Sequence, residues 1–197
     1  MKKLSLLTVS LSLLFFSIVP SFAQDLPTIE TSSGVQVLVL PQSVKDILST
    51  QYQNYRLPNS TDVFGIWKNE VSGSSVPYAA WGDFNSDNYV DITILLIGAG
   101  NYNSNKSRYL GDYKVLIFNG NANGYAVSKE MGTAFGGGAA WAPQDISIEL
   151  VKKGVVINDS DAPINKDRIR YAIDEMIDTL IYWDGTEYKI EILSNSS

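Results

Sequence analysis

The sequence has no histidine and no cysteine among its 197 residues. Without histidine, the chain can build neither a Ser-His-Asp triad nor a Cys-His pair, and a zinc site with imidazole ligands is excluded. Without cysteine, it can form no disulfide. The remaining catalytic chemistry belongs to carboxylate pairs, lysine, tyrosine or a metal ion bound by oxygen atoms. Composition therefore favours a protein that is not an enzyme.

Long apolar runs are also absent, except at the start of the chain. Lys2 and Lys3 precede an apolar stretch over Leu4–Val19, and small residues lead up to Ala23. This pattern predicts a secretory signal peptide over residues 1–23, cleaved after Ala23. An uncleaved membrane anchor is the alternative, but the run is shorter than the ~20 residues that a spanning helix needs. We therefore expect a periplasmic or secreted protein, with no membrane segment after cleavage.

Positive charge is scarce in the expected mature chain. Removing 23 of the 197 residues leaves 174, and the 15 Lys and Arg fall to 13 against 21 Asp and Glu, a net charge of −8. This balance argues against nucleic acid and anionic membranes as partners and favours cation binding. The length predicts a single globular domain over residues 24–197.

Hydrophobic periodicity predicts one helix followed by strands. Gln24–Ser33 is polar and expected to be irregular, and residues 34–40 form a short strand. Apolar residues at i, i+3 and i+4 spacing predict an amphipathic helix over 41–55. Strands are expected at 63–70, 75–84, 89–98, 113–120 and 124–132, with hairpins in 145–159 and 179–193. Residues 168–183 fit a helix or a strand, and 99–112 a polar loop. The predicted fold class is α+β, an antiparallel β meander with the N-terminal helix packed on the sheet.

The most informative stretch is WGDFNSDNYVDITILLIGAG, which begins at Trp81. Its Asp83, Asn85, Asp87, Tyr89 and Asp91 occupy positions 1, 3, 5, 7 and 9 of one loop. Alternate residues of a tight loop can turn their oxygens inward, and the carbonyl of position 7 adds another. Three carboxylates, an amide oxygen and a carbonyl suit Ca²⁺, which takes six to eight oxygen ligands.

The loop does not fit the helical calcium motifs. Position 12 is Ile94, where an EF-hand needs a bidentate Glu, and position 6 is Asn88 instead of Gly. The residues after Asp91 are typical of a strand and not of a helix. A dockerin fails for the same reason at position 12.

The stretch resembles the calcium loop of FG-GAP (integrin-type) and related VCBS repeats, whose pattern is approximately G-D-F-N-G-D-G-x-x-D-L-x-V-G-A-P. The matching residues are Gly82, Asp83, Phe84, Asn85, Asp87, Asp91 and Gly98-Ala99, with Phe64-Gly65 upstream. The resemblance implies that Ca²⁺ is held by the side chains of Asp83, Asn85, Asp87 and Asp91 and by the carbonyl of Tyr89.

The resemblance covers about residues 63–100 and has two departures. Ser86 and Asn88 stand where the pattern has glycines. A single copy is present, and a propeller needs at least four blades. The resemblance therefore implies one unit of the kind embedded in small exported bacterial proteins, and not a full propeller. An Asx-rich turn without an ion remains the alternative, since Asp and Asn favour turns for their own reasons.

Three functional hypotheses follow from these features. The first is an exported, non-enzymatic, Ca²⁺-stabilised domain that binds a protein or a glycan. The second is a secreted hydrolase that uses paired carboxylates. The third is an inhibitor or accessory subunit that presents an acidic face. The sequence favours the first.

Overall fold

The computed structural model describes residues 24–32, 35–58, 76–98, 101–103, 108–110, 112–132, 146–156, 164–173 and 177–193. The predicted signal peptide and the predicted strand at 63–70 lie outside these residues. In chain order the elements are β1 (Thr28–Ser32), β2 (Val35–Val39), α1 (Gln42–Gln51), β3 (Tyr55–Arg56), β4 (Ala79–Gly82), β5 (Asp91–Gly98), β6 (Asn101–Asn103), β7 (Arg108–Leu110), β8 (Tyr113–Asn121), β9 (Gly124–Gly132), β10 (Ile146–Val151), β11 (Arg168–Ile173), β12 (Ile177–Trp183) and β13 (Tyr188–Leu193). The described chain is thus mainly antiparallel β with one short helix, and its strands form neither a closed sheet nor a propeller.

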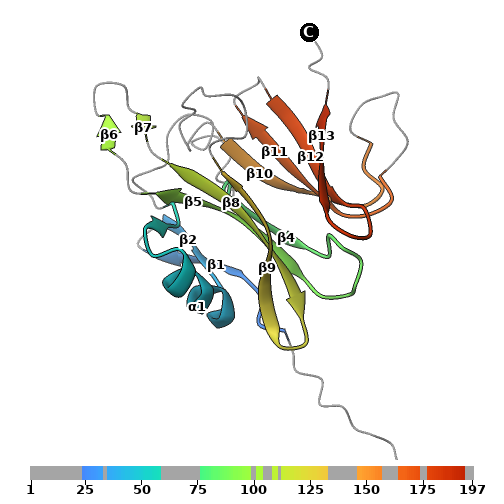
Figure 1. Ribbon diagram of the computed structural model, residues 1–197, viewed down its shortest axis with the longest axis horizontal. Helices are drawn as coiled ribbons and strands as arrows, with labels where there is room; N and C mark the ends of the chain where they lie inside the picture. Colours follow the sequence, from blue (N-terminus) through green and yellow to red (C-terminus); the bar gives the residue numbers. More distant parts are fainter. Residues whose placement is uncertain are drawn as a thin grey trace, which may run out of the picture.

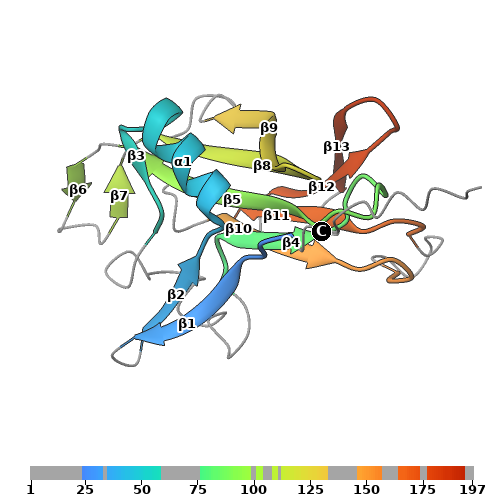
Figure 2. The same cartoon turned by 90° about the horizontal axis from the view of Figure 1, so that it is seen from below.

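Two sheets make up most of the fold (Figure 1). The central sheet has the order β3-β5-β8-β9, with β4 also paired to β5, and the C-terminal sheet has the order β10-β11-β12-β13. Every pair of strands is antiparallel. The β1–β2 and β6–β7 hairpins are separate, and Figure 2 shows β1 and β2 extending away from the two sheets. The C-terminal sheet is a simple meander, as predicted, whereas the central sheet is not.

A short segment before β4 joins the two sheets. The N–H of Ile148 in β10 donates to the carbonyl of Pro77 at 2.8 Å, and the N–H of Leu95 in β5 donates to the carbonyl of Tyr78 at 2.8 Å. Tyr78 and Ile148 form a parallel bridge. Residues 76–78 therefore hydrogen-bond to both sheets and hold β4 against β10.

The hydrophobic core lies around β5, in which every residue is buried. Its β-branched and leucine side chains have no solvated face, because β5 is covered on both sides. Phe84, Phe118, Ile146 and Tyr188 are among the largest fully buried side chains and come from the loop after β4, from β8 and from the C-terminal sheet. One apolar cluster thus includes residues of both sheets.

Helix α1 packs beside β9 (Figure 1). It begins after Pro41, whose carbonyl accepts the N–H of Lys45 at 3.1 Å. Val44 is fully buried, and Ile47 and Leu48 pack against the main core, so the apolar stripe faces inward as its spacing predicts. No helix of the described residues is long and apolar enough to cross a membrane.

Four predictions about local structure were wrong. Residues 28–32 are not irregular, because they pair with β2 over the whole of β1. The helix ends at Gln51 instead of continuing to 55, and β3 follows it. The expected polar loop at 99–112 contains the paired β6 and β7. Finally, the strand that pairs with β10 is β11 and not a segment directly after the turn at Lys153-Gly154, and the ambiguous segment 168–183 contains two strands, β11 and β12.

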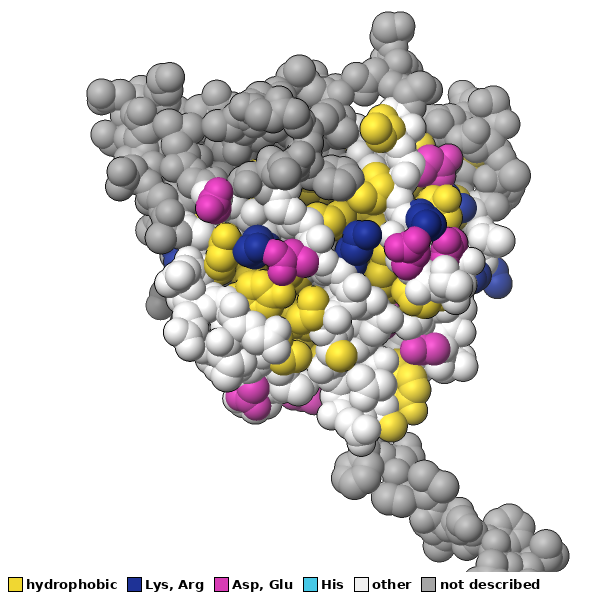
Figure 3. Space-filling model, viewed as in Figure 1, with side chains coloured by type: hydrophobic (Ala, Val, Ile, Leu, Met, Phe, Trp, Pro, Cys, Tyr) yellow, Lys and Arg dark blue, Asp and Glu magenta, His cyan; other side chains and the backbone are white. Residues whose placement is uncertain are grey.

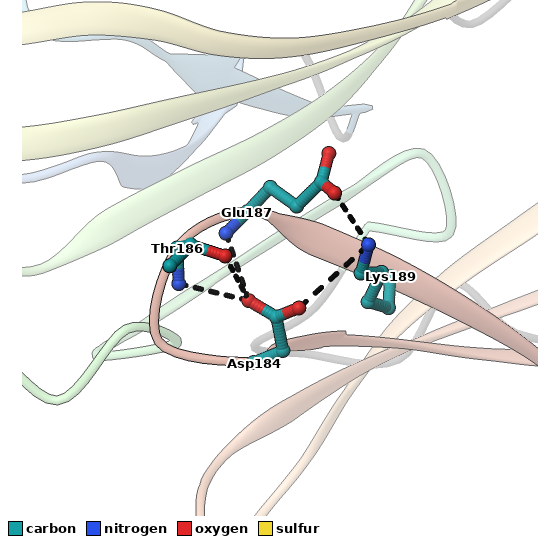
Figure 4. Close-up of polar contacts among 4 residues, drawn as sticks. All are labelled: Asp184, Thr186, Glu187 and Lys189. Carbon is teal, nitrogen blue, oxygen red and sulfur yellow. Dashed lines mark hydrogen bonds and ion pairs between the residues drawn. The ribbon is translucent and has the colours of Figure 1, made fainter.

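The predicted hairpin at 179–193 is present, and Asp184 organises its turn (Figure 4). Asp184 Oδ1 accepts hydrogen bonds from the backbone N–H of Thr186 at 2.8 Å and of Glu187 at 2.9 Å, and from the Thr186 hydroxyl at 2.8 Å. Gly185 has a φ of +111°, which a residue with a side chain rarely adopts. These backbone and hydroxyl donors lower the pKa of Asp184 from its ordinary 3.8 to about 2.

We expect the turn to contribute stability only while Asp184 is charged. Because its folded pKa is depressed, this contribution is complete above pH ~4 and is lost as the pH falls toward ~2. Asp184→Asn should therefore lower the unfolding midpoint at pH 7, and the difference from the wild type should shrink between pH ~4 and ~2. Glu187→Gln is the control, since the Glu187 carboxylate pairs with Lys189 on the surface and accepts no backbone N–H of this turn. A difference that stays constant with pH would contradict this account.

Candidate functional site

The acidic residues lie in the loop between β4 and β5. The pair Gly82 and Asp91 closes this loop as the last register pair of the two strands. Phe84 is the only apolar side chain in the first half of the loop, and it is fully buried. It fixes the loop against the core, while Ser86, Asp87 and Asn88 are exposed.

Asp91 is a carboxylate buried in the core, with no exposed surface. Its Oδ2 accepts the backbone N–H of Phe84 at 3.0 Å and of Asn85 at 3.2 Å. Its Oδ1 accepts the backbone N–H of Gly120 in β8 at 3.0 Å. Asp91 therefore fastens the start of the loop to the end of a strand 29 residues away.

Tyr188 extends this contact to the other sheet. Its phenol oxygen lies 2.8 Å from Asn119 Oδ1 and 3.3 Å from Asp91 Oδ2, so the hydroxyl hydrogen is directed between two acceptors. Trp183 covers the Tyr188 ring edge-on, with the ring centroids 5.0 Å apart. A polar contact inside an apolar core thus links β13 to β5 and β8.

The electrostatics of this cluster are unfavourable to negative charge. Burial raises the pKa of the Asp91 carboxyl to about 6, against the opposing effect of the Gly120 N–H, and the charge of Asp87 raises it further. Burial also raises the pKa of the Tyr188 phenol, and the carboxylates of Asp91, Asp87 and Asp83 add to this effect. Burial and the neighbouring carboxylates therefore both disfavour negative charge in this cluster.

The outer part of the loop is held by its own side chains. Asp83 Oδ1 and Asn85 Oδ1 both accept the N–H of Asp87, at 3.1 and 3.0 Å, so these two oxygens converge on one point. Asp83 Oδ2 accepts the N–H of Asn88 at 3.1 Å, and Asp87 Oδ1 accepts the N–H of Tyr89 at 2.8 Å. Each is an Asx-type contact that folds the backbone around side-chain oxygens.

The backbone is left-handed at two residues of the loop. Ser86 has a φ of +65° and Asn88 a φ of +71°. These are the two positions at which the FG-GAP pattern has glycine. Asn tolerates this region better than most residues, whereas Ser enters it at a cost of order 1 kcal/mol. The loop thus adopts the conformation that the glycines of the pattern would permit, without having them.

Three contributors to this site were missed by sequence reasoning. Gln24 bonds to both backbone groups of Val90, and Gly120 and Tyr188 bond to Asp91. A Cβ on Gly120 would lie 2.3 Å from the carbonyl oxygen of Val90, so only glycine fits there. None of the three has a local sequence signal, because each meets the loop from a distant part of the chain.

The expected ligand residues lie on one loop but do not all face the same way. Asp83 and Asn85 converge with their side-chain oxygens, while the Asp91 carboxylate points toward Gly120 and Tyr188 in the core. Within the described ranges, no three Asp or Glu side chains are grouped as they would be around a metal ion. The donors suit a hard cation in chemistry, with two of the five provided by the Asn85 amide and the Tyr89 carbonyl.

The features behind the other two hypotheses gain no support. The described residues line cavities of about 430 and 370 Å³; the first contains no carboxylate, and the second contains Asp25 alone. On the face in Figure 3, some acidic side chains lie beside Lys or Arg and others lie singly, and they do not form one continuous acidic surface.

We expect Asp91 to be the most sensitive residue of the site. Asp91→Ala leaves three backbone N–H groups without their acceptor, so the free energy of unfolding should fall by about 3 kcal/mol or more. Tyr188→Phe removes one donor and leaves the N–H contacts intact, so it should cost about 1 kcal/mol. Urea unfolding of the two variants measures both values. Equal losses would mean that Asp91 does not organise the loop.

Comparison of the chain with protein-family models, with curated proteins and with solved structures found no match.

Proposed function

We propose that the protein is an exported, non-enzymatic domain that binds a protein or glycan partner and whose Asp83–Asp91 loop is stabilised by Ca²⁺. The observation that carries the proposal is the convergence of the Asp83 and Asn85 side-chain oxygens within a loop that is left-handed at Ser86 and Asn88. This backbone conformation keeps several oxygen donors on one short segment, as Ca²⁺ binding requires.

Repulsion between the carboxylates of the loop favours binding of a cation. Asp83, Asp87 and Asp91 lie in one loop, and the charge of Asp87 disfavours ionisation of Asp91. A divalent cation would relieve this repulsion. Asp83, Asn85 and Asp87 would hold it with their side chains and Tyr89 with its carbonyl. Asp91 Oδ1 accepts one hydrogen bond, from Gly120, and has capacity for a further contact.

The role of the ion is structural in this proposal. The loop adjoins no described cavity with two carboxylates, and the chain has no histidine or cysteine to act as base or nucleophile. Fixing the loop fixes the end of the central sheet, where Gly120 and Asn121 lead into the β8–β9 turn. We expect this end of the sheet to be the part of the partner surface that depends on calcium.

Thermal unfolding with CaCl₂ and with EGTA tests the proposal. At a Ca²⁺ concentration about 100 times Kd, the ion should add about 2.7 kcal/mol to the free energy of unfolding. Asp87→Asn should abolish most of this increment, because it removes one charge while its remaining oxygen can still accept the N–H of Tyr89.

Asp184→Asn is the matched control. It makes the same chemical change in another exposed Asx turn, far along the chain in the β12–β13 hairpin. Its calcium increment should equal that of the wild type. If Ca²⁺ shifts neither the wild type nor Asp184→Asn, the loop is an Asx-rich turn without an ion and the proposal fails.

A further inference from the structure

Gln24 is the first described residue of the chain, and its side chain is bound at both ends of its amide. Nε2 donates to the carbonyl of Val90 at 2.7 Å, and Oε1 accepts the N–H of Val90 at 2.8 Å. Val90 lies between Tyr89 and Asp91 and is half-buried. The Gln24 amide therefore satisfies both backbone groups of one residue in the acidic loop, as a neighbouring strand would.

The surrounding structure is built around this contact. A Cβ at Gly120 would lie 2.3 Å from Gln24 Nε2, so the glutamine amide occupies the space next to a position that has no side chain. The following residue is also fixed: the Tyr125 hydroxyl donates to the carbonyl of Asp25 at 3.1 Å, and the N–H of Gln42 donates to Asp25 Oδ2 at 3.3 Å. Both residues at this end of the chain are thus docked on the β8–β9 turn and on α1.

Cleavage after Ala23, which is part of the proposed export, would make Gln24 the N-terminal residue. A free N-terminal glutamine can cyclise without any co-reactant. The α-amine attacks the side-chain Cδ, an N–Cδ bond forms, the Cδ–Nε2 bond breaks, and Nε2 leaves as ammonia with the proton from the amine. The product is a neutral lactam.

We propose that Gln24 is a modification site of the exported chain that folding protects: docked on Val90, its amide is withheld from cyclisation, and cyclisation of the unfolded chain removes the contact. The lactam has lost Nε2, and its carbonyl and its one remaining N–H, on the former α-nitrogen, are held in a ring next to the backbone. From there they do not reach the two groups of Val90 as the extended glutamine side chain does. The order of folding and cyclisation after cleavage therefore decides whether the acidic loop is fastened at this point.

The test uses the chain from residue 24 to 197, released in vitro by a protease that leaves Gln24 first, and kept in EGTA. Neither export nor calcium is needed, so its outcome is independent of both. Intact mass spectrometry follows the loss of ammonia in buffer and in urea. The folded chain should cyclise at least about tenfold more slowly than the unfolded chain, because two hydrogen bonds must open first. Equal rates would overturn the proposal.

Two matched chains complete the experiment. A chain that retains Ala23 before Gln24 cannot cyclise and should unfold at the same temperature as the fresh chain. The chain cyclised in urea and then refolded should unfold at a lower temperature, as should Gln24→Ala. Gln42→Ala serves as the control glutamine, since the Gln42 side chain donates to Asp46, which is exposed and lies on the same helix. If the cyclised chain and Gln24→Ala unfold like the fresh chain, the contact with Val90 does not fasten the loop.

Discussion

The buried carboxylate of Asp91 is the constraint on which the rest of the structure depends. A charged group in a core costs several kcal/mol unless its oxygens are satisfied. Asp91 meets this demand by collecting the N–H groups of Phe84, Asn85 and Gly120, which come from the loop and from β8. The loop cannot leave the sheet, and β8 cannot shift its register against β5, without exposing or abandoning these groups.

The loop therefore has two parts with different roles. Asp91 is directed inward, where three backbone N–H groups offset part of the cost of burying its charge. Asp83, Asn85 and Asp87 are directed toward the loop's own N–H groups nearer the surface, where water or a cation has access. The left-handed residues Ser86 and Asn88 lie in this outer part of the loop, and the Asx contacts offset their conformational cost. A motif that looks uniform in the sequence is therefore built from one buried anchor, Asp91, and a separate set of half-buried or exposed side-chain oxygens.

Local patterns in the sequence predicted the elements whose cause is local. Strands β5, β8 and β9 and the β12–β13 hairpin follow from β-branched runs and turn residues such as Asp184-Gly185. Strand β1 was missed because its polar residues give no apolar run. It is a strand because its backbone pairs with β2. The predicted partner of β10 was wrong: β10 pairs with β11, and not with a strand directly after the turn at Lys153-Gly154.

For the candidate site, the sequence predicted that the outer acidic residues form a loop. It did not predict the contacts of Gln24 with Val90 and of Tyr188 with Asp91, because these residues are 66 and 97 positions apart in the chain.

Both ends of the described chain thus meet at this loop. Gln24 holds Val90 from one side, and Tyr188, at the start of the last strand, meets Asp91 from the other. The burial that raises the pKa of Asp91 exists only when both sheets are assembled. A short peptide with the same acidic residues would keep its Asx turns but would have neither Gly120 nor Tyr188 to bury the anchor. Any property of the loop that depends on its shape, cation affinity included, is therefore coupled to folding of the whole domain and not to the motif alone.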